Sequence, residues 1–392
     1  MMFVIVKMMD IPILCIYAVY LLFLISTCGC DRGKNVLVFG GNGLIGAASV
    51  DRMLEQGHKL TLLTRGNWYW DTEETIKPRV NLVKCDRMKK LRECWTDLPE
   101  YFDAIVDFSG FDPYMIKDAI EVFKGRIGRY IYISSDSVYD VCEKHHDGLT
   151  VETDSVRPKD PKEQDILNKK DDYAHRKLAG EEVLVKQRKD GGIPYFFIRL
   201  PDVIGSRDNT HRWWVYQAWL RISPYLDTKV TVPKSLKNYP MSFVYVWDVA
   251  DIVAKSLDFG IELLDEAYNF AFDETPTLPD VLNIMKKYMN RENIDFQIND
   301  DEKAVHLFPS VIRGPITCDK AKNKLNFKST PFEDAARQTI EFYEKAITNN
   351  KYRKERKSLI QTLETFSPEN VKNVYIGLKQ EYGIDITNRD EL

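Results

Sequence analysis

The chain has 392 residues, of which 44% are hydrophobic, 12% are aromatic and 29% are charged. This composition excludes a disordered chain, and the length allows two lobes with a substantial apolar core. The formal net charge is −4, and lysine and arginine are spread along the sequence. Because no block of basic residues marks a phosphate-binding surface, we expect no nucleic acid among the partners.

Residues 1–30 have the pattern of a secretory signal peptide. Lys7 precedes an apolar run from Ile11 to Ile25, and small residues follow it. A basic start, an apolar middle and a small-residue end are typical of a segment that is removed after export. The apolar run has about 15 residues, slightly fewer than the roughly 17–25 that span a bilayer. A signal anchor that stays in the membrane remains the alternative.

The last four residues are Arg389-Asp390-Glu391-Leu392. They differ at one position from the Lys-Asp-Glu-Leu retention address. A cleaved signal and a type II anchor would both place this end of the chain in the lumen. The two ends together predict residence in the lumen of the endoplasmic reticulum and binding of a retention receptor through the terminal RDEL.

Beyond residue 30 the cysteines are Cys85, Cys94, Cys142 and Cys318. Their spacing matches neither a disulfide framework nor a zinc site. An oxidising lumen allows a disulfide, and Cys85 with Cys94 is the nearest pair. We nevertheless expect four small buried hydrophobic side chains, and no metal site.

Strands and helices alternate along the first half of the chain. Apolar runs predict strands at 35–39, 60–63, 80–83, 104–108, 130–133 and 195–198. Helical spacing predicts helices at 47–56, 115–123 and 173–188. This alternation with right-handed crossovers predicts an α/β fold, a doubly wound parallel sheet, as a Rossmann dinucleotide-binding domain over residues 31–200.

The sequence pattern of residues 201–350 predicts a smaller C-terminal α/β lobe that binds substrate. Strand character returns at 242–246, and helical spacing returns at 249–257, 278–289 and 332–347. We expect residues 242–257 to pack back on the Rossmann domain. Residues 351–392 predict a helical C-terminal extension that begins KYRKERK and ends in RDEL. The charged run is interpreted as a solvated helix face.

The first strand ends in a glycine-rich loop, FGGNGLIG, at residues 39–46. Gly40, Gly43 and Gly46 have the spacing of a turn that leads from a strand into a helix. Backbone N–H groups of such a turn, including those of Leu44 and Ile45, can approach a pyrophosphate, and the helix dipole favours its charge. We therefore expect these five residues to bind a dinucleotide.

The end of the second strand indicates which dinucleotide is bound. An acidic residue at this point would bond the ribose 2′-hydroxyl of NAD. The sequence has Arg65 instead, whose guanidinium group can pair with a 2′-phosphate. NADP is therefore preferred and NAD is the alternative. Asp86, at the end of the third strand, is either an acceptor for the adenine amino group or an ordinary turn residue.

Tyr173 and Lys177 are four residues apart in a predicted helix, which places both side chains on one helix face. A neighbouring ammonium group stabilises a phenolate and lowers the tyrosine pKa from its usual value of about 10. Tyr173 could then remove a proton from a substrate hydroxyl while hydride leaves the same carbon. The pair follows the glycine loop and the fifth strand in the order that this chemistry needs.

The chain resembles extended or atypical short-chain dehydrogenases/reductases, in the NAD-dependent epimerase/dehydratase group. The motifs that carry this resemblance are FGGNGLIG, ISSDSVY, YAHRK and IRLPDVIG. TLLTRG, CDRM and DFSGFDP are also similar to the branch that contains chloroplast stem-loop-binding proteins and bacterial sugar-epimerase relatives.

The resemblance implies a role for each matching residue. Ser135 would bond the reacting oxygen, with Tyr173 as acid/base and Lys177 as its partner. The other implied contacts are Phe108, Ser109 and Gly110 with the cofactor, Pro201 and Val203 with its nicotinamide end, and Arg207 and Arg212 with substrate.

Asp136 matches the catalytic acid of sugar-nucleotide dehydratases. In those enzymes a glutamate follows it as the base that takes a carbon-bound proton. Ser137 stands at that position here, so elimination would need another base, whereas epimerisation needs only Ser135, Tyr173, Lys177 and the nucleotide.

We therefore expect an NAD(P)-dependent epimerase, dehydratase or reductase in the endoplasmic reticulum lumen, acting on a sugar nucleotide or a similar hydroxyl substrate. One alternative is a cofactor-binding scaffold that has lost catalysis. Another is a lipid or steroid alcohol dehydrogenase, if Trp213, Trp214 and Trp219 line an apolar pocket rather than pack in the core. Relatives often dimerise through helices beside the sheet, including the Tyr173 helix, so a homodimer is a further expectation.

Overall fold

The computed structural model describes residues 33–386, except 90, 96–100, 228 and 301–304. The predicted signal segment and the terminal RDEL fall outside these residues, so both remain predictions. Among the described helices, none has the length and apolar character needed to cross a membrane.

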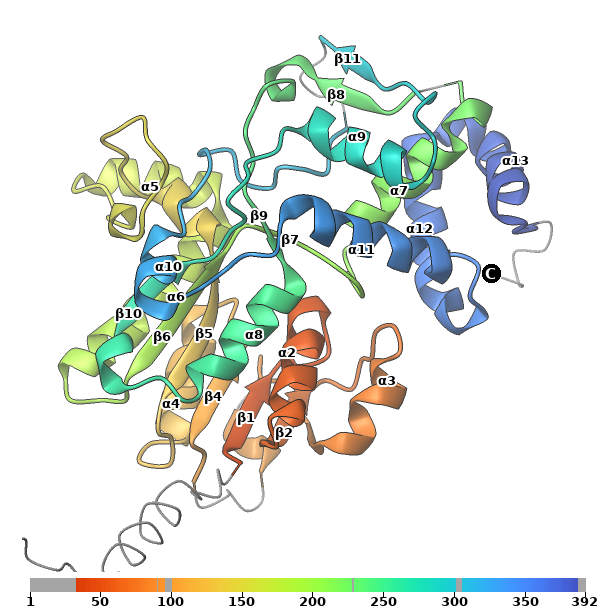
Figure 1. Ribbon diagram of the computed structural model, residues 1–392. Coiled ribbons are helices and arrows are strands. Elements are labelled where there is room, and N and C mark those ends of the chain that lie inside the picture. Colours follow the sequence, from red (N-terminus) through yellow and green to blue (C-terminus); the bar gives the residue numbers. More distant parts are fainter. Residues whose placement is uncertain (1–32, 90, 96–100, 228, 301–304, 387–392) are drawn as a thin grey trace, which may run out of the picture. The chain divides into compact units, whose positions relative to one another are not determined.

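A seven-stranded sheet forms the centre of the described chain (Figure 1). The strand order is β10-β6-β5-β4-β1-β2-β3, and every neighbouring pair is parallel. The strands are β1 (Asn35–Phe39), β2 (Lys59–Thr64), β3 (Asn81–Lys84), β4 (Ala104–Asp107), β5 (Tyr130–Ser135), β6 (Tyr195–Leu200) and β10 (Glu266–Asn269). The central strands β4 and β6 are buried at every residue, as expected for a sheet covered on both faces. The predicted doubly wound α/β fold is confirmed.

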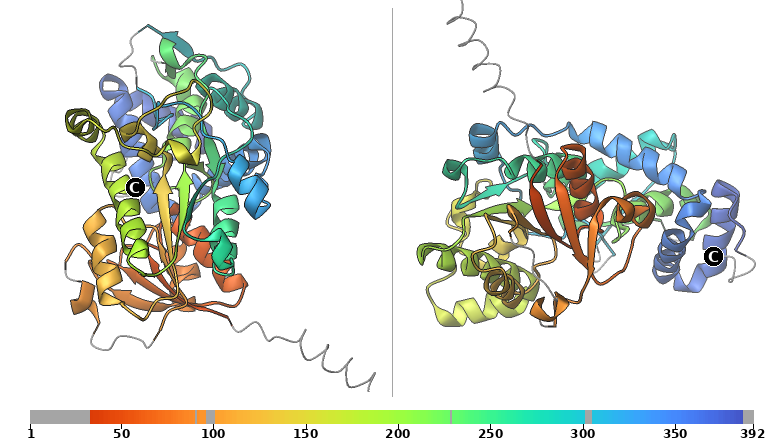
Figure 2. Two further views of the ribbon diagram at one scale, coloured as in Figure 1. Left: turned by 90° about the vertical axis from the view of Figure 1, so that its left-hand side faces the viewer. Right: turned by 90° about the horizontal axis from the view of Figure 1, so that it is seen from below.

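Helices cover both faces of the sheet (Figures 1 and 2). On one face α2 (Leu44–Glu55) packs against α8 (Val246–Ser256), and on the other α4 (Pro113–Val122) packs against α6 (Asp172–Lys189). Alternate side chains of a strand point to opposite faces. Val36 and Val38 of β1 therefore join the apolar core under α2, whereas Leu37 and Phe39 join the core under α4.

The elements after β6 extend the core under α2 without a break. β7 (Asp202–Ile204) pairs with β9 (Phe243–Tyr245), and β8 (Thr231–Pro233) pairs with β11 (Gln297–Asn299). The helices of this part are α7 (Arg212–Ile222), α9 (Leu278–Tyr288), α10 (Asp319–Leu325) and α11 (Phe332–Ala346). Trp213, Trp214 and Trp219 of α7 are at most 4% exposed and belong to the core. Their interpretation as core packing is confirmed.

The C-terminal helices α12 (Arg353–Phe366) and α13 (Val371–Tyr382) pack against α7 (Figure 1). Glu355 and Arg356 are each only 7% exposed. The Glu355 carboxylate accepts a hydrogen bond from the Trp70 N–H at 2.8 Å, and Arg356 donates to the Ile347 carbonyl at 2.9 Å. The expectation of a solvated helix face is therefore wrong for this part of the charged run, because its side chains satisfy buried backbone groups.

A disulfide joins Cys85 to Cys94, whereas Cys142 and Cys318 are free and buried. The expectation of four unpaired thiols is thus wrong for the first pair and confirmed for the second. Cys85 follows β3 directly, and Cys94 ends a short helical turn, Leu91–Cys94. The two cysteines close a small loop beside the carboxyl ends of the strands.

We expect Cys94→Ser to lower the free energy of unfolding by about 2–3 kcal/mol, because closing a loop of roughly ten residues restricts the unfolded chain by that amount. Denaturant unfolding of the two proteins, with and without dithiothreitol, measures this difference. In the reductant the difference should vanish. An equal difference in both conditions would show that the disulfide does not form.

Candidate active site

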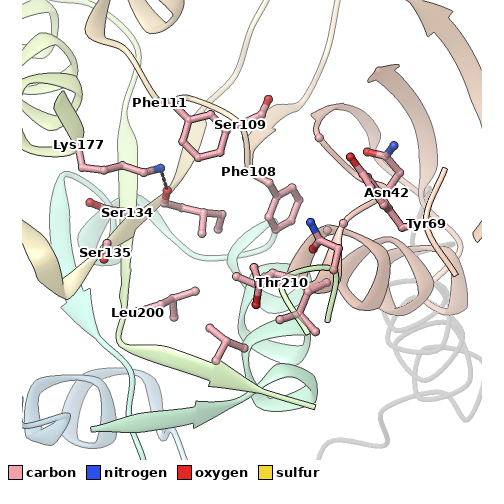
Figure 3. Close-up of a pocket in the computed structure, with 18 of the residues that line it drawn as sticks. Asn42, Tyr69, Phe108, Ser109, Phe111, Ser134, Ser135, Lys177, Leu200 and Thr210 are labelled. Carbon is pink, nitrogen blue, oxygen red and sulfur yellow. Dashed lines mark hydrogen bonds between the residues drawn. The ribbon is translucent and has the colours of Figure 1, made fainter. Parts of the chain in front are cut away.

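The loops that follow β1, β2, β3, β4, β5 and β6 surround one pocket of about 710 Å³ (Figure 3). In parallel α/β sheets, ligands bind at this edge, outside the carboxyl ends of the strands. The predicted residues that line the pocket are Gly40, Gly43, Leu44, Ile45, Gly46, Arg65, Asp86, Phe108, Ser109, Ser135, Asp136, Tyr173, Lys177, Pro201, Val203 and Arg212. Gly110 and Arg207 are not part of this lining.

The glycine loop is shaped for close contact with a ligand. Gly40 has a φ of +79°, in the left-handed region that glycine adopts without strain. A Cβ atom on Gly46 would lie 2.3 Å from the Gly40 carbonyl oxygen, so only glycine fits this turn. Helix α2 begins directly after Gly43 and presents its N-terminus to the pocket. These features fit the pyrophosphate of a dinucleotide.

The end of β2 carries positive charge and no acid. Arg65 is exposed and lines the pocket. A Cβ atom on the following Gly66 would lie 3.0 Å from the Lys84 side chain, which comes from the end of β3. Asn42 of the glycine loop donates to the Thr64 hydroxyl at 3.2 Å and so ties the loop to β2. Arg65 therefore lies on the pocket wall where the adenosine ribose of a dinucleotide would be bound, and Lys84 lies beside the next residue, Gly66.

The end of β3 carries Asp86 and a buried ion pair that the sequence did not reveal. Asp86 lines the pocket and accepts a hydrogen bond from the Met88 N–H at 3.1 Å. The next residue, Arg87, is buried and pairs with Asp107 at 2.6 Å. Asp107 also accepts a hydrogen bond from the Tyr130 hydroxyl at 2.5 Å. The Arg87–Asp107 pair thus fixes the loop after β3 to the end of β4, and Asp107 links this pair to Tyr130 at the start of β5.

Ser135, Tyr173 and Lys177 come together on one wall of the pocket (Figure 3 labels the first and third). Ser135 ends β5, and Tyr173 lies in the first turn of α6, which Asp171 caps by accepting the Ala174 N–H at 2.9 Å. Tyr173 is 46% exposed as a residue. Partial desolvation of its hydroxyl group raises its pKa to about 12, and a hydrogen bond with Ser135 partly opposes this rise. The Tyr173 phenol is therefore protonated at neutral pH in the unliganded pocket.

The ammonium group of Lys177 is held between two backbone carbonyls. It donates to Ile133 at 2.9 Å and to Gly110 at 3.2 Å, and the residue is 2% exposed. Figure 3 shows the Lys177 side chain reaching toward the pocket wall. Its nitrogen lies 5.9 Å from the centre of the Tyr173 ring, within cation–π range. Burial lowers the pKa of Lys177 to about 8, although nearby Asp107 opposes this shift. Gly110 thus contributes to the site by fixing Lys177.

Asp136 lies next to Ser135 and is 5% exposed. The Ser135 hydroxyl donates to its carboxylate at 3.3 Å. Burial raises the pKa of Asp136 well above its usual value, and the nearby carboxylate of Asp202 adds to the rise. Burial and the neighbouring carboxylate therefore favour the protonated form of Asp136, which can donate a proton.

The two predicted substrate arginines are placed differently. Arg212 lines the pocket, pairs with buried Asp202, and lies over the Phe308 ring at 5.1 Å from its centre. Arg207 pairs with Asp51 at 3.0 Å and with Asp71 at 2.7 Å. The predicted contact of Arg207 with substrate is corrected, because two carboxylates hold its guanidinium group outside the pocket lining.

Some lining residues were missed by the sequence analysis. Asn42 and Tyr69 lie at the dinucleotide end, and Thr210 and Ser310 lie at the other end, beside Asp202 of the 200–203 segment that the resemblance places at the nicotinamide. Asp202 accepts hydrogen bonds from both the N–H and the hydroxyl of Ser310, at 2.8 and 2.5 Å. Asp202 stands inside the quoted IRLPDVIG motif, so its position was a usable signal, whereas Ser310 is distant in sequence and gave none.

A buried polar network contacts the carboxyl end of β5, where Ser134 and Ser135 lie. Glu181 of α6 forms a two-point ion pair with Arg199 of β6, at 2.6 and 3.0 Å. The same carboxylate accepts a hydrogen bond from the Ser134 hydroxyl at 2.6 Å. This network joins α6, β5 and β6, the three elements that deliver Tyr173, Ser135 and Pro201.

No group of three or more histidine, cysteine, aspartate or glutamate side chains that could hold a metal ion occurs among the residues that the structure describes.

A glycine loop, a strand-end serine and a Tyr–Lys pair around one pocket define a dinucleotide-binding protein of the short-chain dehydrogenase/reductase type. The chain belongs to the NAD dependent epimerase/dehydratase family, which it matches over residues 36–271. No curated protein sequence gives a significant match.

Solved sugar-nucleotide enzymes have a similar fold. UDP-glucose 4-epimerase from Thermotoga maritima, solved with UDP-glucose, is 17% identical, with a TM-score of 0.61 over 80% of this chain and 99% of its own. dTDP-glucose 4,6-dehydratase from Bacillus anthracis, solved with NAD, is 18% identical, with a TM-score of 0.62 over 83% and 100%. UDP-glucuronic acid 4-epimerase from Bacillus cereus, with UDP-glucuronic acid and NAD, is 16% identical, with a TM-score of 0.59 over 79% and 99%.

The lowered pKa of Lys177 predicts a pH-dependent stability. Between pH 8 and about pH 10.4 the unfolded chain holds a proton on Lys177 that the folded protein has lost, so stability rises with pH. Relative to Lys177→Met, the wild type should gain about 3 kcal/mol of unfolding free energy between pH 7 and pH 10.5.

Denaturant unfolding across this pH range measures the gain. Lys189→Met is the matched control, because Lys189 is an exposed lysine of the same helix, and its difference from the wild type should stay constant. A constant difference for Lys177→Met as well would contradict the burial of its charge.

Proposed function

We propose that the protein is an NAD(P)-dependent epimerase or reductase of the epimerase/dehydratase type that acts on a hydroxyl carbon of a sugar nucleotide or a similar compound. The observation that carries the proposal is the convergence of Ser135, Tyr173 and Lys177 on the pocket that the glycine loop also lines. The solved epimerases with similar folds, one with UDP-glucose and one with UDP-glucuronic acid, support the substrate class.

The residues divide the proton chemistry among them. Ser135 bonds the reacting oxygen, and Tyr173 takes or returns its proton. A phenol with a pKa of about 12 is a poor acceptor at neutral pH, so proton transfer needs added positive charge near the ring. The Lys177 ammonium supplies part of that charge from within the helix. Bound NAD(P) supplies the hydride acceptor and donor.

Asp136 favours one reaction type over another. Burial favours its protonated form, which can donate a proton to a substrate oxygen. Loss of water also needs a base for the carbon-bound proton, and Ser137 stands where dehydratases have their glutamate. We therefore favour epimerisation or reduction, in which Tyr173 alone exchanges the hydroxyl proton.

Tyr173→Phe should lower kcat by about 10²–10⁴-fold, because the ring keeps its packing but loses the transferable proton. Turnover of a panel of sugar nucleotides with NADP or NAD measures this effect, and cofactor affinity should be unchanged. A biological effect that survives the substitution would favour a cofactor-binding scaffold instead.

Asp136→Asn distinguishes the reaction types. For an epimerase or reductase we expect a loss in kcat of less than about 10-fold, whereas a dehydratase should lose about 10²–10⁴-fold, the range for removal of a general acid. The same turnover assays give the answer, with binding of the cofactor as the control for correct folding.

We further propose that NADP is preferred over NAD. Arg65 lines the pocket, Lys84 lies beside Gly66, and β2 ends without an acid. The family is described as NAD dependent and several solved neighbours contain NAD, so the proposed preference for NADP differs from them.

Arg65→Ala should weaken NADP binding by roughly 10–100-fold, since a charge-assisted hydrogen bond contributes about 1.5–3 kcal/mol. NAD binding should change little. Titration of both nucleotides measures the two dissociation constants, and Lys59→Ala, at the opposite end of β2, is the matched control. Equal weakening of NADP and NAD would argue against a 2′-phosphate contact.

We also propose that the protein resides in the endoplasmic reticulum lumen and is held there by a receptor for its RDEL end. The Cys85–Cys94 disulfide supports an oxidising compartment. A homodimer through α4 and α6 is a further proposal, supported by the half-exposed Tyr114 on α4. A lipid alcohol dehydrogenase is disfavoured, because the three tryptophans of α7 are buried and none lines the pocket.

A further inference from the structure

The loop between β2 and α3 (Thr72–Thr75) forms one wall of the pocket, through Arg65, Asn67 and Tyr69. It follows the strand whose end contacts the adenosine ribose in dinucleotide-binding folds. On its other side the loop meets residues 350–356, where the C-terminal extension begins.

Trp70 is the centre of this contact. Its φ is +55°, a left-handed conformation that a bulky residue adopts only where its surroundings impose it. Its backbone N–H donates to the Glu355 carboxylate at 2.8 Å, and both residues are buried. Its indole ring lies 5.2 Å from the Tyr352 ring and 5.4 Å from the Phe342 ring. The conformation of the loop is thus fixed by residues of the C-terminal part of the chain.

Lysine contacts surround the Trp70–Glu355 hydrogen bond. Lys354 donates to the Trp68 carbonyl at 3.3 Å, and its ammonium lies 5.9 Å from the centre of the Tyr69 ring. Lys351 pairs with Glu74 at 2.7 Å, just after the loop. Residues 350–356 therefore contact the loop at several successive positions, including the residue before Trp70 that lines the pocket.

The family match ends at residue 271, so this contact comes from a part of the chain outside it. We infer that the C-terminal extension completes the cofactor site, with Glu355 as the positioning residue that holds the 65–71 loop in its binding conformation. The inference rests on the proposed dinucleotide as ligand. Glu355 itself does not line the pocket, and it acts through Trp70.

The test compares two substitutions in the full chain. Glu355→Gln keeps a side-chain oxygen that can accept the Trp70 N–H, whereas Glu355→Leu has a similar size and no acceptor. Lys357→Ala is the matched control, since Lys357 is an exposed residue of the same helix. The dissociation constants of NADP, NAD and adenosine 2′,5′-bisphosphate are measured by titration, together with kcat at saturating cofactor.

We expect Glu355→Leu to raise all three dissociation constants about 10-fold, which corresponds to about 1.4 kcal/mol. Glu355→Gln should stay within about threefold of the wild type, Lys357→Ala should match it, and kcat should change little. Hydrogen exchange of the backbone amides of residues 66–72 should be faster in Glu355→Leu. If Glu355 only stabilised the packing of the C-terminal helices, exchange in this loop would not change.

If Glu355→Leu does not fold, Lys354→Ala takes its place, because that side chain is exposed and contacts the same loop. A rise of about two- to threefold in the dissociation constants then supports the inference, and no rise overturns it. Unchanged affinities in Glu355→Leu with a lower melting temperature would also overturn it, leaving the proposed cofactor intact. A wild type that binds none of the nucleotides would overturn the proposed function as well.

Discussion

The ammonium group of Lys177 is buried where β4, β5 and α6 meet, and its position depends on how closely the helix approaches the sheet. A Cβ atom on Gly180, one turn further along α6, would lie 2.6 Å from the Ile116 side chain and 2.9 Å from the Tyr132 hydroxyl. A Cβ on Gly110 would lie 2.8 Å from the Asp107 carboxylate. Glycine at these two positions lets the helix and the loop after β4 approach Lys177 closely enough to bond it.

Burying a charge is costly unless partners compensate for it. Asp107 and Glu181 are the acids that raise the pKa of Lys177 against the effect of burial. Each is already bound to an arginine, Asp107 to Arg87 and Glu181 to Arg199. They therefore act on Lys177 through space rather than by direct pairing. Two of the three ammonium donors bond carbonyls, and the third remains for a ligand.

The parts of the site that the sequence predicted are those whose chemistry is local. Gly40 and Gly46 are required by one turn, and the spacing of Tyr173 and Lys177 follows from one helix. Six strands of the sheet could be expected for a similar reason, since each is a short apolar run, whereas the edge strand β10, with the sequence EAYN, was not predicted. In all these cases the information lies within a few residues of chain.

The features that could not be predicted depend on contacts between residues that are far apart in the sequence. An arginine at position 207 could contact substrate as far as the sequence shows, but its side chain pairs with Asp51 and Asp71 instead. Asp51 is 156 residues away in the sequence. Cys85 and Cys94 formed a recognisable pair, and only their proximity in space decides that they are joined. A charged residue such as Glu355 has the same appearance in a sequence whether it is solvated or satisfies a buried N–H group 285 residues away.

Two segments that line the pocket, the loop with Arg65 and Tyr69 and the loop with Thr210 and Arg212, meet at residues with left-handed backbone conformations. Trp70, Arg207 and His211 all have positive φ values, between +55° and +69°. Such residues each cost on the order of 1–3 kcal/mol and persist only where the surrounding structure determines them. The segment around Trp70 contacts the segment that carries Arg207 and His211. The Trp70 and His211 rings are 5.9 Å apart, and Arg207 pairs with Asp71, the residue after Trp70.

The junction therefore joins the wall that carries Arg65 and Tyr69 to the wall that carries Thr210 and Arg212. Neither wall can relax alone, because the aromatic packing around Trp70 includes residues from α7, α11 and the turn before α12. The strain at the junction is offset by contacts from the C-terminal part of the chain. Since the two walls face the two ends of one pocket, this packing fixes the shapes of both ends together.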